Sequence, residues 1–167
     1  MGDAFRRAVY PGTFNPIHYG HIDIVRRASR VFDEVIVAVY ENPDKPQLFD
    51  AIERVELIER GVVEFGNVKV ASFSGLAVDY LASVDAWIMI RGLRVFSDFE
   101  YEFRMALANQ RLAPELEVVN FITSEQNLHV SSTTVREIAS LGGDVSSMVP
   151  NYVAERLAMR YAELKKS

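Results

Sequence analysis

The sequence has no cysteine and no surplus of positive charge, and each lack removes a class of function. Without Cys among its 167 residues, the chain has no disulfides, thiolate nucleophiles or Cys-ligated zinc. Its 18 Lys and Arg stand against 23 Asp and Glu, a formal net charge of −5 that argues against a broad nucleic-acid-binding face. Any anion site must therefore be local.

Long apolar runs are also lacking. The longest, such as residues 35–40 and 86–90, are far below the roughly 20 residues that a membrane-spanning helix requires. The first residues are polar and reach an apolar strand too soon to hold the hydrophobic region of a signal peptide. We expect a soluble protein with neither membrane nor nucleic-acid partners. The zero cysteine count fits a reducing compartment, and we expect a cytoplasmic location.

Two common nucleotide-binding motifs are missing. The chain has neither a Gly-x-x-x-x-Gly-Lys-Ser/Thr phosphate loop nor a Gly-x-Gly-x-x-Gly dinucleotide fingerprint, which weakens kinase, GTPase and dehydrogenase interpretations. No His/Glu cluster has the spacing of a protein-built metal cage. We therefore predict no metal-ligating residues and expect any divalent ion to arrive with a nucleotide, largely water-ligated.

The composition predicts one compact domain over residues 1–167, since 49% of the residues are hydrophobic and 25% charged. Short β-rich runs predict strands at residues 8–10, 35–40, 68–72, 86–90 and 117–122. None alternates with polar residues, which is typical of strands covered on both faces. Stretches at helical period predict helices at residues 21–31, 52–65, 76–83, 99–112, 132–141 and 150–165. The expected fold is a doubly wound α/β domain with a mainly parallel five-stranded sheet.

In such sheets the ligand crevice lies beyond the carboxyl ends of the strands. The first segment there, residues 10–21, reads Tyr-Pro-Gly-Thr-Phe-Asn-Pro-Ile-His-Tyr-Gly-His. Gly20 allows close backbone approach at a helix N-terminus, where amide donors favour phosphate, and His21 can supply a hydrogen bond and some positive charge. A lone histidine there is more often structural. The whole string, however, resembles the signature of the HxGH nucleotidyltransferase superfamily.

A second segment, residues 130–136, reads Val-Ser-Ser-Thr-Thr-Val-Arg and resembles the Ser-Ser-Thr-x-x-Arg signature of the same superfamily. Hydroxyls and amides at a helix start would bind the β- and γ-phosphates, with Arg136 one turn further on. Alone, the segment would be a plain N-cap. Together with the first motif it indicates a nucleotide site.

A third segment, residues 90–102, reads Ile-Arg-Gly-Leu-Arg-Val-Phe-Ser-Asp-Phe-Glu-Tyr-Glu and closely resembles the phosphopantetheine adenylyltransferase family. The resemblance runs from residue 7 to about residue 153. It implies a Rossmann-like nucleotidyltransferase fold, a homohexamer built as a dimer of trimers, and transfer of the adenylyl group of ATP to 4'-phosphopantetheine. The products would be 3'-dephospho-CoA and pyrophosphate, a step of coenzyme A biosynthesis.

The resemblance also implies site residues. The catalytic residues would be His21, Lys45 and Arg91, and the acceptor contacts would be Thr13, Lys45, Ala77 and Arg91. The ATP contacts would be Thr13, Phe14, His21, Gly92, Leu93, Arg94, Glu102, Asn127, Leu128, His129, Val130, Ser131, Ser132 and Thr133.

Structural alternatives stand beside several of these roles. Lys45 can be a flexible loop charge, and Glu102 can be one end of a helix ion pair with Arg104 or another nearby base. Arg91 and Arg94 can be a solvated surface pair. His18 can be a second phosphate contact or a loop strut.

The implied chemistry is an in-line displacement in which an acceptor phosphate oxygen attacks the α-phosphorus of ATP. No general base is needed because an ionised phosphate is already a nucleophile, so catalysis would rest on positioning and on charge stabilisation by the cationic residues and Mg²⁺. Adenylyl transfer to nicotinamide mononucleotide, cytidylyl transfer and a non-catalytic nucleotide-binding domain are the competing interpretations. Residues 91–102 and the short chain oppose the two enzymatic rivals, and retention of His21, Lys45 and Arg91 opposes the last.

Overall fold

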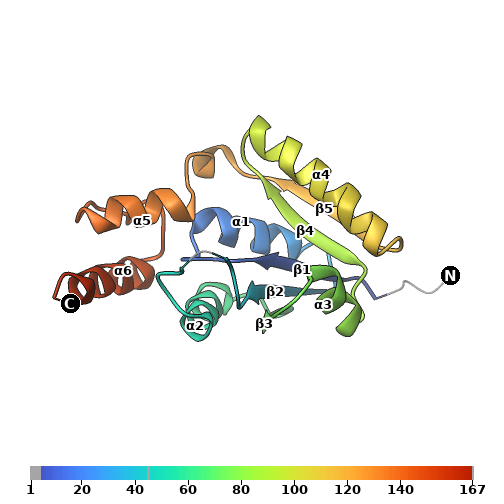
Figure 1. The fold of residues 1–167 in the computed structure, drawn as a ribbon, viewed down its shortest axis with the longest axis horizontal. Helices are drawn as coiled ribbons and strands as arrows, with labels where there is room; N and C mark the ends of the chain where they lie inside the picture. The colour runs from blue at the N-terminus through green and yellow to red at the C-terminus, as the bar shows by residue number, and fades with distance from the viewer. Residues whose placement is uncertain (1–4, 45, 167) are drawn as a thin grey trace.

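The computed structural model describes residues 5–44 and 46–166, except for the side chain of Ser97, and is built around one five-stranded sheet (Figure 1). The strand order is β3-β2-β1-β4-β5, and every neighbouring pair is parallel. The strands are β1 (Arg7–Gly12), β2 (Glu34–Tyr40), β3 (Val68–Phe73), β4 (Ile88–Leu93) and β5 (Glu117–Ile122). The predicted α/β class and five-stranded, mainly parallel sheet are confirmed.

Helices occupy the connections between strands and the C-terminal part of the chain. They are α1 (Tyr19–Ala28), α2 (Ala51–Val62), α3 (Ala77–Ser83), α4 (Phe96–Leu112), α5 (Ser132–Ser140) and α6 (Asn151–Leu164). All six predicted helices are present, with ends that differ by up to three residues. A short 3-10 helix, η1 (Glu125–Asn127), was not predicted, because three residues carry no periodic pattern.

Two apolar clusters cover the two faces of the sheet. The larger cluster packs the inward side chains of β1 and β2 against α1 and α2 and extends to α5 and α6, which lie side by side (Figure 1). The smaller cluster packs the opposite face of the sheet against α3. Helix α4 runs beside β4.

Coverage differs between the middle and the edges of the sheet. Residues of β1 and β2 are buried along almost their whole length, as the continuous apolar runs predicted. The edge strands β3 and β5 are only partly covered, and Ile122 at the end of β5 is 70% exposed. The prediction that every strand is covered on both faces is therefore wrong for the edges, where one neighbouring strand is missing.

The boundaries predicted for the fourth strand are wrong in a way that matters for the site. The apolar run ends at Ile90, yet β4 continues to Leu93, because Arg91 pairs with Asn120 and Gly92 with Phe121 of β5. Sheet pairing needs only backbone groups, so a charged residue and a glycine do not end it. Arg91 therefore stands within the end of the strand rather than in the following loop, and its backbone is held by the sheet.

Local contacts fix the start of α2 and the end of α5. Asp50 caps α2 in a reciprocal box with Glu53. Gly142 has φ +79 and follows the end of α5, and the Gly143 N–H donates to the Ile138 carbonyl at 2.9 Å. This is a Schellman ending, in which the left-handed conformation of Gly142 stops the helix.

Candidate active site

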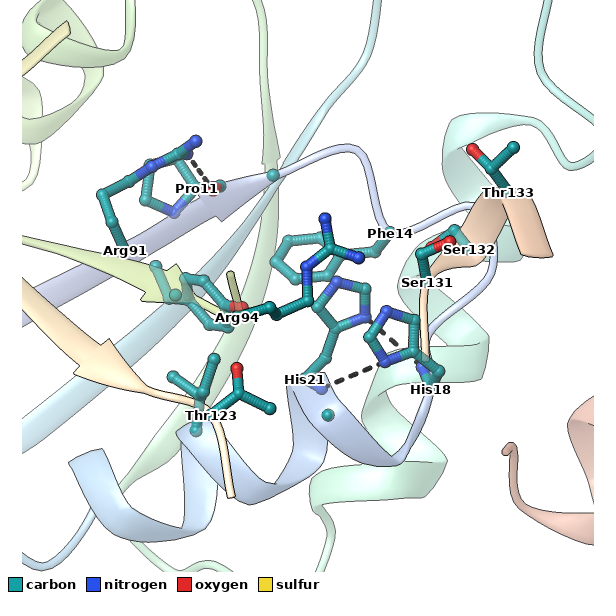
Figure 2. Close-up of a pocket in the computed structure, with 15 residues that line it drawn as sticks. Pro11, Phe14, His18, His21, Arg91, Arg94, Thr123, Ser131, Ser132 and Thr133 are labelled. Carbon is teal, nitrogen blue, oxygen red and sulfur yellow. Dashed lines mark hydrogen bonds between the residues drawn. The ribbon is translucent and has the colours of Figure 1, made fainter. Parts of the chain in front are cut away.

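The carboxyl ends of β1 and β4 meet the starts of α1 and α5 around a hollow that we call the polar pocket (Figure 2). Two histidines, two arginines and several hydroxyl side chains line it. The full lining is Tyr10, Pro11, Gly12, Phe14, His18, Gly20, His21, Ile24, Arg91, Gly92, Arg94, Thr123, Ser131, Ser132 and Thr133. This is the crevice that doubly wound topology predicts.

A second hollow, which we call the apolar pocket, opens between α3 and α4 on the neighbouring side of β1 and β4. Its lining is mostly aliphatic, aromatic and thioether side chains: Pro11, Gly12, Thr13, Tyr40, Phe73, Gly75, Leu76, Ala77, Val78, Met89, Arg91, Tyr101, Glu102, Met105, Ala106, Asn109, Leu112 and Val118. Pro11, Gly12 and Arg91 belong to both linings, so the two pockets meet at these residues.

Two histidines cap the start of α1. The His18 ring Nδ1 accepts the backbone N–H of His21, and the His21 Nδ1 accepts the backbone N–H of His18, each at 3.3 Å. Their rings stack with centroids 3.6 Å apart. Since Nδ1 of His21 acts as an acceptor, the proton of the neutral ring is on Nε2. His21 therefore presents an Nε2–H donor on the lining of the polar pocket.

Both histidines are held in the neutral form. Burial, together with the positive charge of Arg94, lowers the pKa of His18 to about 3. Burial also places the pKa of His21 well below its ordinary value, with further lowering by His18 and Arg94. The predicted hydrogen-bond donor is present at His21, but the predicted positive charge is not, because desolvation of the ring and the neighbouring His18 and Arg94 oppose protonation.

Aromatic packing holds the His21 ring from the other side. The Phe14 ring lies edge-on to it at 4.9 Å between centroids and to Tyr10 at 5.2 Å. Phe14 has φ +50, in the left-handed region that a bulky side chain rarely adopts. Such a backbone persists only where surrounding contacts enforce it. The loop after β1 is thus held in one shape around His21.

Arg91 and Glu102 form a forked ion pair between β4 and α4. The Nε and Nη2 groups of Arg91 donate to the two carboxylate oxygens of Glu102 at 2.8 and 2.7 Å, and Nη1 donates to the Pro11 carbonyl at 3.2 Å. The alternative of an ion pair for Glu102 is confirmed, but its partner is Arg91. Arg104 contacts Glu100 instead, at 4.0 Å.

Arg91 keeps its charge although it is partly buried. Burial lowers the pKa of Arg91, but the hydrogen bonds and negative charge of Glu102 outweigh this effect and raise the pKa overall. Three of the five guanidinium N–H donors are used by Glu102 and Pro11, which leaves two for a ligand. Arg91 is therefore a partly buried, aligned cation at the junction of the pockets, not a solvated surface residue.

Arg94 is fixed by the helix that follows it. Its Nε and Nη2 groups contact the Asp98 carboxylate at 3.2 and 3.4 Å, and Nη1 contacts the Val130 carbonyl at 3.3 Å. In Figure 2 its side chain extends over the histidine pair, in agreement with its effect on both pKa values. Arg94 is the second local cation of the polar pocket.

The start of α5 contributes backbone donors more than hydroxyls. The Ser131 hydroxyl accepts the Thr134 N–H at 3.0 Å as an N-cap, and the Ser132 hydroxyl donates to the Pro16 carbonyl at 2.8 Å. Arg136, expected near the phosphates, donates to the Asn15 carbonyl. The first N–H groups of a helix have no intrahelical partner, so the anion-binding capacity here rests on the amides and the helix dipole.

The structure brings most of the predicted site residues to one of the two pockets. The polar pocket contains Phe14, His21, Arg91, Gly92, Arg94, Ser131, Ser132 and Thr133. The apolar pocket contains Thr13, Ala77, Arg91 and Glu102. The remaining predicted ATP contacts lie on neither lining: Leu93, Asn127, Leu128, His129 and Val130. Lys45 lies outside the described residues.

Some lining residues were not predicted from the sequence. Tyr10 and Thr123 stand at strand ends and resemble ordinary sheet residues. Tyr101, Met105 and Asn109 lie four residues apart on one face of α4 and line the apolar pocket. Their spacing is visible in the sequence, but only the packing of α4 against β4 turns that face toward a hollow.

Membrane-spanning helices and metal-binding clusters are both absent from the described part of the chain. No helix within residues 5–44 and 46–166 has the length and apolar character to cross a membrane. In the same part of the chain, no three His, Cys, Asp or Glu side chains form a group that could hold a metal ion.

The chain has relatives that can be recognised by their sequences. The Cytidylyltransferase-like family matches residues 9–138. Phosphopantetheine adenylyltransferase of Clostridium beijerinckii is 48% identical over 155 residues, 93% of this chain and 98% of that protein. The enzyme of the same name from Heliobacterium modesticaldum is 52% identical over 156 residues, 93% of each chain. The chain belongs to the phosphopantetheine adenylyltransferase family.

Structural similarity reaches beyond the phosphopantetheine adenylyltransferase family but shows only the shared fold. A Vibrio parahaemolyticus protein provisionally named nicotinate-nucleotide adenylyltransferase superimposes with a TM-score of 0.72 over 95% of this chain and 96% of its own, at 17% identity. Such low identity does not transfer an acceptor. The much higher identity to phosphopantetheine adenylyltransferases over nearly the whole chain supports the family indicated by residues 90–102.

Proposed function

We propose that this protein transfers the adenylyl group of ATP to 4'-phosphopantetheine, forming 3'-dephospho-CoA and pyrophosphate in coenzyme A biosynthesis. The observation that carries the proposal is the meeting of a polar and an apolar pocket at Arg91. Adenylyl transfer to a phosphate brings two anionic substrates together at one phosphorus atom. A partly buried cation shared by two hollows of different character suits that meeting point.

ATP would occupy the polar pocket. The local cations Arg91 and Arg94 and the start of α5 offer donors to a polyphosphate in a chain that is otherwise acidic. We also propose that the predicted contacts outside this lining, residues 127–130, border the nucleotide from the loop before α5. They follow β5 at the same end of the sheet.

The acceptor would occupy the apolar pocket, with its phosphate directed toward Arg91. Phosphopantetheine is a long, flexible arm with a phosphate at one end, and a hollow lined by Leu76, Ala77 and Met105 suits the arm. Thr13 stands beside the junction and would contact the acceptor phosphate. Lys45, predicted to share this task, follows β2, whose last residue Tyr40 lines the same pocket.

In the reaction, an oxygen of the acceptor phosphate forms a bond to the α-phosphorus of ATP while the bond to the departing pyrophosphate breaks. His21 would donate its Nε2–H to an oxygen of the α-phosphate as charge accumulates there. Arg91 would align the attacking phosphate with its two remaining N–H groups. No side chain need remove a proton, because the attacking oxygen is already ionised.

We propose that Mg²⁺ enters with ATP. The residues that line the polar pocket carry cationic, hydroxyl and amide donors and include no carboxylate. This lining fits an ion held by phosphate oxygens and water rather than by the protein. When bound, the ion would neutralise part of the charge of the leaving pyrophosphate.

We also propose that the chain forms one nucleotidyltransferase domain. Six copies of it would assemble into a homohexamer, a dimer of trimers. Helix α4 supports assembly because it exposes a row of stacked rings: Phe96 is 89% exposed, and its ring lies 6.3 Å from that of Phe99, which lies 6.0 Å from that of Phe103. Light scattering at micromolar concentration should give a mass near six chains. A monomer would overturn this part of the proposal. The cytoplasmic location stays a prediction.

One assay tests the reaction. ATP and Mg²⁺ are offered with phosphopantetheine, nicotinamide mononucleotide or glycerol phosphate in separate reactions, and pyrophosphate release is measured in each. We expect rapid release with phosphopantetheine alone. Faster release with either other acceptor would reassign the apolar pocket, and no release with any acceptor would contradict the enzymatic proposal.

A further inference from the structure

Arg54 is a buried cation on the first turn of α2. It is only 1% exposed and heads the largest fully buried side chains of the described chain. Its guanidinium donates to four backbone carbonyls: those of Phe49 and Asp50 at 3.2 Å each, Thr13 at 2.8 Å and Tyr40 at 2.9 Å.

No carboxylate forms an ion pair with Arg54 in the part of the chain that the structure describes. The two carboxylates whose negative charge acts on the pKa of Arg54, those of Asp50 and Glu41, have other hydrogen-bond partners. Asp50 caps the Glu53 N–H, and Glu41 accepts a hydrogen bond from Ser72. Burying a cation without an ionic partner is costly, and an apolar side chain of similar length would pack α2 without that cost. The hydrogen bonds to the four carbonyls are therefore the reason for an arginine at this buried position.

These four carbonyls belong to three segments around the proposed acceptor site. Thr13 lies in the loop after β1 and lines the apolar pocket. Tyr40 is the last residue of β2, and Phe49 and Asp50 immediately precede α2. The segment between Tyr40 and Phe49 carries Lys45. Arg54 therefore fastens both ends of that segment to the backbone of Thr13.

A second contact also joins the start of α2 to the loop after β1. The buried Phe49 N–H donates to the Asn15 side-chain oxygen at 3.1 Å, so the start of α2 holds the loop after β1 twice. On its other side the same loop is held from α5, where Ser132 donates to the Pro16 carbonyl and Arg136 to that of Asn15. The loop after β1 is therefore held on one side by contacts with the start of α2 and on the other side by contacts with α5.

We propose that Arg54 is a positioning residue for the acceptor, which holds Thr13 and the two ends of the Lys45 segment in the relative placement that phosphate attack requires. It belongs to the lining of neither the polar nor the apolar pocket and would act only through these backbone groups. The inference rests on the proposed function, because it needs the acceptor to bind beside Thr13. It predicts separate effects on the two substrates.

The test compares Arg54→Lys and Arg54→Met with Ile58→Val, a fully buried substitution one turn further along α2. Lysine keeps a charge but cannot reach four carbonyls with one ammonium, and methionine removes the charge in a similar volume. For both Arg54 variants we expect the KM for phosphopantetheine to rise about 10-fold and kcat to fall about 10-fold, with the KM for ATP within about 3-fold. Ile58→Val should leave all three constants near those of the unsubstituted protein.

A readout besides activity separates positioning from loss of fold. Hydrogen exchange should quicken in peptides covering residues 41–49 in both Arg54 variants, while peptides of β1 and α5 and the Kd for ATP stay unchanged. Equal changes in both KM values, or unchanged kinetics in either folded Arg54 variant, would overturn the inference. If the unsubstituted protein itself fails to use phosphopantetheine, the proposed function fails instead, and the two failures are thereby distinguished.

Discussion

Arg91 and Glu102 face each other across the junction of the two pockets, joined by two parallel hydrogen bonds of 2.8 and 2.7 Å. The pair links the end of β4 to the second turn of α4. A forked guanidinium–carboxylate pair fixes direction as well as charge. The polar and apolar pockets thus share one aligned cation, and its alignment can be tested separately from its charge.

Arg91→Lys keeps the charge and removes the fork. We expect a higher KM for phosphopantetheine and a lower kcat, each by about 10-fold, because one ammonium cannot hold Glu102 and orient a phosphate together. The KM for ATP should move less. Steady-state kinetics with each substrate varied in turn provide the measurement, and Lys45→Ala should act in the same direction. A change confined to the KM for ATP would assign Arg91 to the nucleotide site.

His21→Ala should lower kcat by about 100-fold or more while ATP affinity changes modestly, because in the proposed mechanism the Nε2–H donor would act mainly in the transition state. Calorimetric binding of ATP and single-turnover rates separate the two quantities. Since Ala also removes one half of the cap of α1, the melting temperature is measured beside them. Turnover within a few-fold of the unsubstituted protein would show that His21 is structural.

Gly20→Ala tests the space around the histidine pair. A Cβ at Gly20 would lie 3.0 Å from two atoms of the His18 ring, too close for that ring to keep its place. Moving His18 disturbs the cap that orients His21, so we expect turnover to fall by about 10-fold. The free energy of unfolding should change by only about 1 kcal/mol, because the higher helix propensity of alanine offsets part of the cost of displacing the His18 ring. Chemical denaturation and kinetics on one preparation check both.

Acid should destabilise the protein through His18 before most carboxylates titrate. The folded-state pKa of about 3 lies below the ordinary value of 6.5, so the unfolded chain binds the proton more readily between these values. The stabilising contribution is complete above about pH 6.5 and is lost as the pH falls toward 3. From pH 7 to pH 5 we expect a loss of about 2 kcal/mol from this group. His18→Gln should show a correspondingly weaker pH dependence in urea unfolding. An unchanged slope would mean that His18 titrates normally in the folded protein.

Much of the fold could be predicted because its signals are local. Short β-rich runs predicted all five strands, and stretches at helical period predicted all six helices. The error at β4 had a physical source: hydrophobicity ended at Ile90, whereas backbone pairing with β5 continued through Leu93. The short helix η1 was not predicted for a similar reason, because its three residues take their shape from the connection between β5 and α5 and carry no hydrophobic pattern.

The sequence by itself determined the alternation of strands and helices, the two motifs at the starts of α1 and α5 and the family, because each is written in adjacent residues. Only the tertiary structure decided which partner each charge takes. Glu102 pairs with Arg91 from another element and not with Arg104, and Arg54 takes carbonyls in place of a carboxylate. It also decided that His21 is a neutral donor, since burial beside Arg94 sets its pKa. Ion pairing and desolvation depend on distance in space, which residue spacing along the chain does not contain.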